Sequence, residues 1–513
     1  ARSIVAATTP GWWPLASKTD DPAVLSVEND DGGFTEIKRF VFPKASGRMA
    51  ESLAAYRFPA ATGRVFKLRI PFTANFRLLG QPFIGLAELE LTGDARIENW
   101  GVKAGFLRGA GDDRVSGPPL DDEAADAIPH DRVIDITKHL REDGTLDWEA
   151  PAGTWTILRV GNRFSGKMNH PASVGGIGPE VDKLNAEIFR RFLEEGPIRE
   201  IIELAAGHVG DTLVQFTVDS WEVGAQNYSP GLWEAFRERF GYDPTPYLPV
   251  LNGRVVGSLE KSNRFLWDYR RAISGVITED FFGTFDRYLA QYGLATYAQP
   301  YGDGNFNNLE IGELIDVPSM EFWVGRGEGR LEYMGGDEVR SIAHTYGTGI
   351  MVAEAFTAYG HATNWTQHPG SLKRYGDRAF TQGLTQMRFH SSAHQPWPEI
   401  EPGMSFGALG INFSRNLTWA DQASAWLRYL QRCQAVLGVG EPVADVLFFI
   451  GEKSPNTLFL HQRERDALHG YSYDGCALTP LMGARVEDGM IVLPSGARYR
   501  LLVLEQNEMT PGT

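Results

Sequence analysis

The sequence predicts a multidomain protein of the α/β and β classes, in which an antiparallel β-sandwich is followed by a (β/α)8 TIM-like barrel. Up to about residue 165, short alternating runs are separated by Gly, Pro and Asp turns, which is the pattern of an antiparallel sandwich. After Pro179, longer helical segments alternate with short apolar strands, as in α/β domains. We therefore expect the architecture to change near residue 165.

We expect three domains, because 513 residues is about three times the length of a common domain. Residues 1–165 are predicted to form the sandwich, residues 166–440 the catalytic barrel, and residues 441–513 the start of a further α/β unit that is cut short. The clearest sandwich strands are residues 64–70, 87–91 and 155–160. Residues 109–130 are rich in Gly, Asp and Pro, so they are expected to form a surface loop.

The barrel strands are predicted from short apolar runs at residues 212–217, 295–299, 317–322, 350–355 and 384–389. Helices are expected at residues 184–204, 232–240, 262–292 and 419–437. Five strands do not close an eight-stranded barrel, so we expect the barrel to be incomplete in this chain. In the last unit, residues 443–450 and 499–504 are predicted to be buried parallel strands.

Polar and aromatic residues follow several of the predicted barrel strands. They occur in Asp219-Ser-Trp-Glu222, in Gln299-Pro-Tyr301, in Glu354-Ala-Phe356 and between His390 and His394. In a (β/α)8 barrel the catalytic groups lie at the carboxyl ends of the strands. The sequence therefore predicts an active site at this edge of the sheet.

Charge and hydropathy restrict the partners. The net charge of −16 argues against a nucleic-acid partner, because such proteins present clustered Lys and Arg to the phosphate backbone. No apolar run approaches the roughly 20 residues that span a bilayer, so no membrane span is expected. The chain begins at Ala1 without a leader, which indicates a processed or excised product. A periplasmic or secreted location is favoured over the cytoplasm, and the oligomeric state stays open.

Two carboxylates are candidates for the chemistry of glycoside hydrolysis, which needs one protonated and one ionised carboxyl group beside the anomeric carbon. Glu222 and Glu354 each follow an apolar strand. A carboxylate at the end of a buried run loses hydration unless it is paired. This loss raises the pKa of such a group toward the range that is useful for an acid or a base. For either residue alone, a structural hydrogen-bonding role is an equal alternative, so the prediction depends on the pair.

Aromatic residues are abundant, at 12% of the chain with 13 Trp. Sugar rings stack well on such side chains, and Trp221 beside Asp219 is expected to cover the sugar while Asp219 holds Glu222. A turn Asp and a core Trp are the alternatives. His390 and His394 lack the His-Glu-x-x-His pattern of zinc sites, so we expect them to donate hydrogen bonds to sugar hydroxyls or to fill the core.

Residues 155–451 resemble the α-L-rhamnosidases of glycoside hydrolase family 106. The resemblance depends on a series of motifs that occur in order: Glu180-Val-Asp-Lys-Leu-Asn185, Asp219-Ser-Trp-Glu-Val-Gly224, Asp316-Val-Pro318, Glu321-Phe-Trp323, Ala353-Glu-Ala-Phe-Thr357, His394-Gln-Pro396 and Phe413-Ser-Arg-Asn416.

The resemblance implies an inverting, calcium-dependent enzyme with a sandwich beside a (β/α)8 barrel. It implies that Glu222 is the general acid and that Glu354 is the base that activates water. The calcium ligands are expected among Asn169, Glu180 and Asp182, because hard oxygen donors suit this ion. Family members are usually considerably longer than this chain. The remaining residues expected to bind the substrate are Asp219, Trp221, Asn227, Asp316, Glu321, Trp323 and His394.

The expected substrate is a rhamnosylated small molecule or polysaccharide with a terminal α-L-rhamnose. One alternative is a retaining glycosidase of the (β/α)8 clan, in which the same two Glu residues are acid/base and nucleophile. The separation of the carboxyl groups distinguishes the mechanisms, at roughly 5–5.5 Å for retention and 6.5–9.5 Å for inversion. A second alternative is a non-catalytic carbohydrate-binding protein, which needs no paired carboxylates.

Overall fold

The structure, a computed structural model, describes residues 1–8, 22–40, 53–70, 77–78, 81–82, 86–94, 96–106, 127–169, 172–325, 332–407, 409–460 and 462–504. The chain forms two compact units that alternate along the sequence. Unit 1 comprises Ala1–Asn185, Glu222–Ile277 and Asp303–Phe306, and unit 2 comprises Ala186–Trp221, Thr278–Gly302 and Asn307–Thr513. This division by packing differs from the linear boundaries expected at residues 165 and 440.

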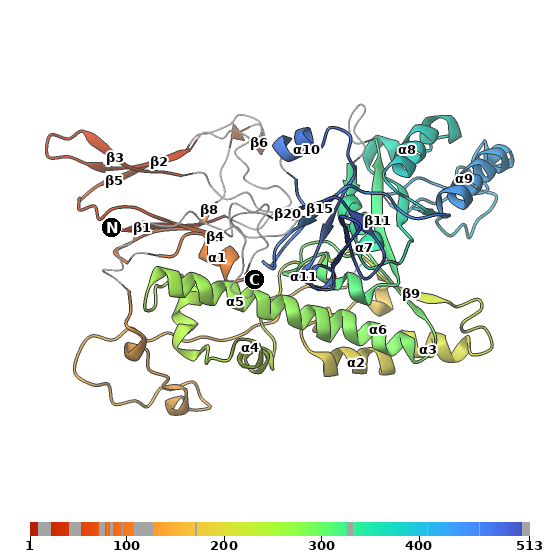
Figure 1. Cartoon of the computed structure of the whole chain (residues 1–513). Helices are drawn as coiled ribbons and strands as arrows, with labels where there is room; N and C mark the ends of the chain where they lie inside the picture. Colours follow the sequence, from red (N-terminus) through yellow and green to blue (C-terminus); the bar gives the residue numbers. More distant parts are fainter. Residues whose placement is uncertain are drawn as a thin grey trace. The chain divides into compact units, whose positions relative to one another are not determined.

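Unit 1 begins with two three-stranded antiparallel sheets, drawn in red to orange in Figure 1. One has the order β4(Leu53–Arg57), β1(Ser3–Thr8), β8(Leu86–Thr92), and the other has the order β3(Phe34–Phe40), β2(Ala23–Glu28), β5(Phe66–Arg69). Buried residues of both sheets, including Ile4 of β1 and Leu25 of β2, belong to one hydrophobic cluster. These two sheets lie in the region where the sandwich was expected, and the sandwich itself stays a prediction.

Two of the three sandwich strands singled out in the sequence are confirmed, as β5 and β8. The third prediction was wrong, because residues 155–160, which the structure describes, form no strand. Ile157 and Val160 are both more than half exposed. The local alternation is present, but no partner strand pairs with it. Most of the predicted loop at 109–130 lies outside the described residues.

The helical part of unit 1 contains α1(Trp100–Lys103), α4(Leu232–Phe240) and α5(Leu259–Val276). Helix α4 has the predicted bounds, and Gly241 ends it with a left-handed backbone conformation that favours Gly. Helix α5 begins after Ser258, whose side chain accepts a hydrogen bond from the Lys261 N–H. The two helices pack through aromatic side chains such as Phe236 and Phe265.

The main sheet of unit 2 has the order β14(Gln386–Phe389), β13(Val352–Ala358), β11(Val317–Val324), β10(Ala295–Ala298), β9(Gln215–Val218). These five strands are all parallel to their neighbours, and β12(Glu332–Met334) pairs antiparallel with β11. All five predicted barrel strands are thus confirmed. The predicted helix at 184–204 is two helices, α2(Ala186–Glu195) and α3(Pro197–Leu204), because Gly196 and Pro197 interrupt it.

Several helices accompany this sheet in unit 2. The predicted segment at 262–292 continues from α5 through a π-helical turn at Ile277–Phe282 into α6(Gly283–Ala290). The predicted last barrel helix is α9(Ala423–Leu437). Two helices that the sequence reading missed are α7(Gly336–Thr345) and α8(Pro369–Thr381). No described helix is long and apolar enough to cross a membrane.

The two faces of the main sheet differ, because side chains alternate along each strand. On one face, alternate residues of β11 and β13, such as Met320 and Ala353, join a hydrophobic cluster with α7, α8 and α9. The other residues of these strands include Ser319, Glu321 and Glu354. The second face is therefore polar. The helices α8 and α9 can be followed in Figure 1.

The polar face is concave. The guanidinium carbon of Arg388 on β14 lies 4.2 Å from the ring centroid of Tyr297 on β10, although β13 and β11 separate these strands. In a flat sheet, three strand spacings would hold the two side chains about 14 Å apart. The sheet is thus a curled half-barrel, and closure into eight strands stays a prediction.

The C-terminal part of unit 2 contains a three-stranded parallel sheet with the order β16(Tyr473–Cys476), β15(Val446–Phe449), β20(Leu501–Leu504). The parallel strands predicted at 443–450 and 499–504 are therefore confirmed. A small antiparallel sheet adds β17(Arg485–Glu487), β18(Met490–Val492) and β19(Arg498–Tyr499).

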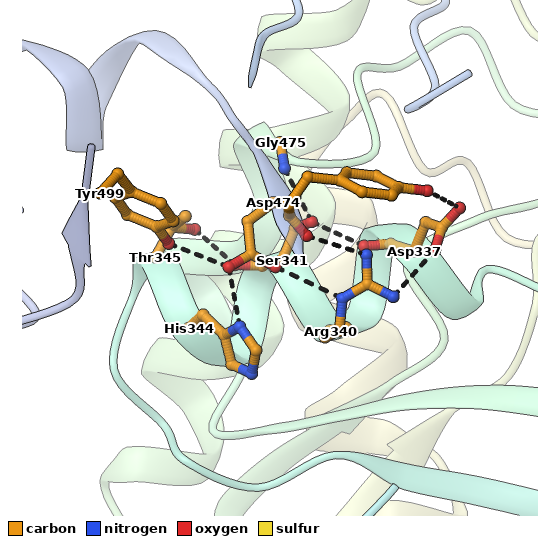
Figure 2. A network of polar contacts seen from close by, with 9 residues as sticks. Asp337, Arg340, Ser341, His344, Thr345, Asp474, Gly475 and Tyr499 are labelled. Carbon is orange, nitrogen blue, oxygen red and sulfur yellow. Dashed lines mark hydrogen bonds and ion pairs between the residues drawn. The ribbon is translucent and has the colours of Figure 1, made fainter. Parts of the chain in front are cut away.

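A buried ionic network joins α7 to this C-terminal sheet (Figure 2). The carboxylate of Asp474 on β16 contacts His344 Nδ1 at 2.8 Å, the Tyr499 hydroxyl at 3.0 Å and Arg340 Nε at 3.4 Å. Arg340 also donates to Asp337 on its own helix. The Asp474 side chain is 1% exposed, so these partners replace its hydration.

Candidate active site

Four strands of the main sheet present polar side chains at the same edge. Asp219 follows β9, Gln299 follows β10, Glu354 lies on β13 and His390 follows β14. Because all these strands are parallel, their carboxyl ends meet at one edge. The structure therefore brings these polar groups together within unit 2, as the sequence predicted for the strand ends.

Both carboxylate oxygens of Glu354 accept hydrogen bonds. Thr357 Oγ1 donates to Oε1 at 2.6 Å, and Gln299 Nε2 donates to Oε2 at 3.2 Å. His390 Nδ1 lies 3.8 Å from Oε1, beyond hydrogen-bonding distance. The Glu354 side chain is 23% exposed, so it reaches solvent while two donors hold its position.

Asp219 lies close to Glu354. Its Oδ1 accepts the Ser220 N–H at 2.9 Å. Although the residue as a whole is exposed, burial of the carboxyl group raises the pKa of Asp219, and the negative charge of Glu354 raises this pKa further. The hydrogen bond from Ser220 and the nearby His390 act in the opposite direction. The charge of Glu354 thus disfavours ionisation of Asp219 at this edge.

Negative charge also gathers beside Tyr301. Glu321 is the register partner of Glu354 on the neighbouring strand, and its Oε2 accepts the Trp323 indole N–H at 2.7 Å. Burial raises the pKa of Tyr301 well above its usual range, and the charges of Glu321, Glu354 and Asp219 add to this effect. The edge therefore combines three carboxyl groups with aromatic side chains.

Comparison with known proteins identifies the family. A family model described as alpha-L-rhamnosidase, that of glycoside hydrolase family 106, matches residues 33–513. The chain belongs to glycoside hydrolase family 106. The resemblance seen in the sequence is thus confirmed.

Two relatives are similar over much of the chain. A rhamnosidase from Novosphingobium sp. PP1Y has a similar structure, with a TM-score of 0.75 and 27% identity, covering 99% of this chain and 47% of that chain. A protein of Formosa agariphila named "Putative beta-glucuronidase" is 38% identical over 381 residues, which is 74% of this chain and 32% of that protein. The chain thus spans about a third to a half of the length of these relatives.

The family's expected acid and base belong to different compact units. Glu354 lies in unit 2, whereas Glu222 is the first residue of a segment of unit 1. Glu222 is exposed, which differs from the dehydrated strand end that the sequence predicted, because β9 already ends at Val218.

The other residues expected to bind substrate have different surroundings. Trp221 is buried and its ring meets Phe281 edge-on, so its indole is a core side chain in this structure. Asp316 precedes β11 and accepts the Thr296 N–H at 2.9 Å, which places it at the opposite edge of the sheet from Glu354. His394 is exposed in the segment after β14. Their roles toward a substrate stay predictions.

Asn227 of unit 1 has a structural contact. Its side-chain amide donates to the Ala104 carbonyl at 3.0 Å, and its own carbonyl accepts the Tyr269 hydroxyl. Both contacts join it to the segments after α1 and on α5. Asn227 therefore ties three segments of unit 1 together.

The predicted calcium ligands already hold protein partners. The Asn169 side-chain oxygen accepts the Gly178 N–H at 2.8 Å, and Glu180 pairs with Lys183. Asp182 accepts the Leu184 N–H and the Ser229 hydroxyl. Within the described residues, no three His, Cys, Asp or Glu side chains are grouped so as to hold a metal ion. The trio does not fit a calcium site in this arrangement, and calcium binding stays a prediction.

Sequence reasoning did not identify the two donors to Glu354. Thr357 lies three residues after Glu354 on the same strand, so this donor could have been found from its position in the sequence. Gln299 was visible as a polar strand end, but its partner is 55 residues away. The contact depends on the curl of the sheet, which no local pattern reports.

Proposed function

We propose that this chain carries the catalytic half-barrel of an inverting α-L-rhamnosidase, with Glu354 as the base that activates water and Glu222 as the general acid. The observation that supports this most is the pair of hydrogen bonds to Glu354 at the carboxyl edge of the sheet. Donors to both oxygens favour the ionised carboxylate, which a base requires. Membership of the rhamnosidase family supports a rhamnoside as the substrate.

The reaction assigned to these residues is a single displacement. Glu354 removes a proton from water as the water oxygen attacks the anomeric carbon, and Glu222 gives its proton to the departing glycosidic oxygen. Asp219 lies beside Glu354, and burial of its carboxyl group raises its pKa. Its carboxyl is proposed to hydrogen-bond to a sugar hydroxyl. Trp323, fixed by Glu321, is proposed to face the substrate.

The test is hydrolysis of an aryl α-L-rhamnoside by the parent, Glu222→Gln and Glu354→Gln proteins, with the released anomer followed by NMR. We expect inverted product from the parent and losses of several orders of magnitude in both variants. Glu200→Gln, at an exposed position on α3, is the matched control. Retained configuration would indicate the retaining mechanism, and near-normal rates in both variants would favour a carbohydrate-binding protein.

A second candidate is hydrolysis of a glucuronide. The name of the Formosa agariphila relative suggests it, and Arg388 supplies a cation on the concave face, in register with Glu354. An arginine fork suits the carboxylate of a uronic acid. Assay of an aryl β-glucuronide beside the aryl α-L-rhamnoside distinguishes the two, because Arg388→Met should abolish only the uronide reaction.

Calcium dependence is tested separately. Dialysis of the protein against a chelator, followed by restored calcium, measures whether activity is lost and regained. Asp182→Asn, compared with Asp211→Asn at an exposed position, tests the predicted ligand. Equal activity before and after chelation would remove calcium from the proposal.

A further inference from the structure

We propose that Gln299 is a positioning residue that holds Glu354 in the orientation and charge state of a base and ties it to the backbone after β9. This inference rests on the function proposed for Glu354. Gln299 is 3% exposed, and its side chain connects two of the strand ends that form the site. It does not need to touch the substrate to act.

The amide orientation follows from its partners. Gln299 Oε1 accepts the Ser220 N–H at 3.1 Å, and Nε2 donates to Glu354 Oε2 at 3.2 Å. A backbone N–H can only donate, so the amide oxygen must face Ser220. The amide NH2 group must therefore face Glu354, and Gln299 cannot accept a proton from it.

The backbone of Gln299 is fixed as well. Its N–H donates to the Val218 carbonyl at 3.0 Å, and its carbonyl accepts the Tyr301 N–H at 2.9 Å. The side chain therefore starts from a fixed point next to β9. Since Ser220 lies in the Asp219-Ser-Trp-Glu222 motif, Gln299 joins the start of that motif to the base within unit 2.

A donor fixed in this way distinguishes the two possible roles of Glu354. The ionised carboxylate accepts the Gln299 and Thr357 bonds at both oxygens. A protonated carboxyl would place a hydrogen on one oxygen, and of the two side chains that hydrogen-bond to Glu354 only Thr357, whose hydroxyl can also accept, could receive it. Gln299 thus favours the base role and disfavours the acid role.

The charges around Glu354 make this donor important. Carboxyl groups and basic side chains both lie near it at this edge. His390 Nδ1 is 3.8 Å away and makes no hydrogen bond to it. Two neutral side chains donate to its carboxylate, Gln299 and Thr357. The titratable and charged groups at this edge are Asp219, Tyr297, Tyr301, Glu321, Arg388 and His390.

The decisive variant is Gln299→Met, which keeps the length of the side chain and removes the donor. The hydrogen bond from Gln299 is made to a carboxylate oxygen and favours the ionised form, so we expect its loss to move the acidic limb of kcat/KM to higher pH. We expect kcat to fall about 10-fold or more while KM changes little. Gln299→Glu should lose more at neutral pH, because it adds a negative charge beside Glu354.

Gln386→Met is the matched control. Gln386 lies on β14 of the same sheet, is exposed, and begins its strand at the opposite edge. We expect its pH profile to match that of the parent. Should Gln299→Met fail to fold, Gln299→Asn shortens the side chain by one methylene and removes the reach to Glu354. An unchanged acidic limb in a folded Gln299 variant would overturn the proposal, even if the melting temperature fell.

A second readout does not require activity. Carbodiimide labelling of Glu354, followed over pH by peptide mass spectrometry, reports when this carboxyl becomes protonated. We expect labelling to persist to higher pH in Gln299→Met than in the parent. A parent without activity on aryl glycosides would refute the proposed function alone, whereas identical labelling curves would refute the role of Gln299 alone.

Discussion

Unit 2 contains two carboxylate clusters with opposite surroundings. Asp474 is 1% exposed and faces Arg340, His344 and the Tyr499 hydroxyl, as Figure 2 shows. Glu354 is partly exposed, accepts two neutral donors and has other carboxyl groups beside it. At Asp474 the positive charge of Arg340 offsets the negative charge of the carboxylate. At Glu354 neighbouring carboxyl groups add further negative charge.

The difference separates a structural role from a chemical one. A buried carboxylate that is paired with cations keeps one charge state and joins the elements that carry its partners. A partly exposed carboxylate beside a second carboxyl group whose pKa is raised is instead an arrangement typical of acid–base catalysis. Substitutions should therefore affect stability at Asp474 and rate at Glu354.

The largest expected effect is on rate. Glu354→Gln should lower kcat/KM for an aryl α-L-rhamnoside by about three orders of magnitude, because the base is removed, while the melting temperature stays near that of the parent. Steady-state kinetics and calorimetry on the same preparation measure both. A variant that loses stability in proportion to its rate would place Glu354 with Asp474 as a structural carboxylate.

The converse substitution is Asp474→Ala. It removes one of the two carboxylate partners of Arg340 and the hydrogen-bond partner of His344, so the free energy of unfolding should fall by about 3–5 kcal/mol. Urea titration checks this, with Asp421→Ala, at an exposed position, as the control. Below the unfolding transition the rate should stay near that of the parent. Equal stability of the two variants would contradict the structural role of the network.

Lys103 of unit 1 extends the comparison to a buried cation. Burial, with the nearby charge of Arg270, lowers the pKa of Lys103 to about 8, although Nζ donates to Asn263. The folded state therefore binds fewer protons than the unfolded state between pH 8 and 10.5, so the parent gains stability as pH rises through this range. Lys103→Met should stabilise the protein at pH 7, where the buried ammonium is charged, and this gain should shrink as the pH rises toward 10.5. Melting temperatures of the parent and of Lys103→Met, measured at pH 7 and at pH 10.5, test this expectation.

The smallest expected effect is on stability at Asp219. Burial and Glu354 raise its pKa, so the folded state binds more protons than the unfolded state above pH 3.8, and the parent loses stability as pH rises from there through the folded pKa. Asp219→Asn should then melt slightly higher than the parent at pH 7 and equally at pH 3.5, with reduced activity. A lower melting temperature at pH 7 would show that repulsion from Glu354 is not the dominant interaction.

The sequence predicts the parallel strands well because their signal is local. Each combines a short apolar run with a polar end, and all five predicted barrel strands are present. Residues 155–160 carry an equally good alternation, but a strand also needs a partner, which is not a local property. Helix α8 was missed although it begins with Pro369 and a capping box between His368 and Ser371, which is a readable start signal.

The site is less predictable for the same reason. The sequence identifies Glu354 and Asp219 because each follows an apolar run, although β13 continues beyond Glu354 to Ala358. The effect of Glu354 on Asp219 depends on how β9 and β13 approach across the curled sheet. The same curl brings Gln299 to Glu354. The burial expected for Glu222 was wrong because the strand before it ends earlier than its apolar run suggests.

The alternation along β11 and β13 also bears on how new specificities arise. One set of side chains, with Met320 and Ala353, secures the fold, while the intervening set, with Ser319 and Glu354, meets the concave face. Substitutions in the second set change which ligand the concave face binds, with little effect on the packing of the first set. Related proteins with such a sheet can therefore differ in the glycan that they recognise while the hydrophobic core stays unchanged.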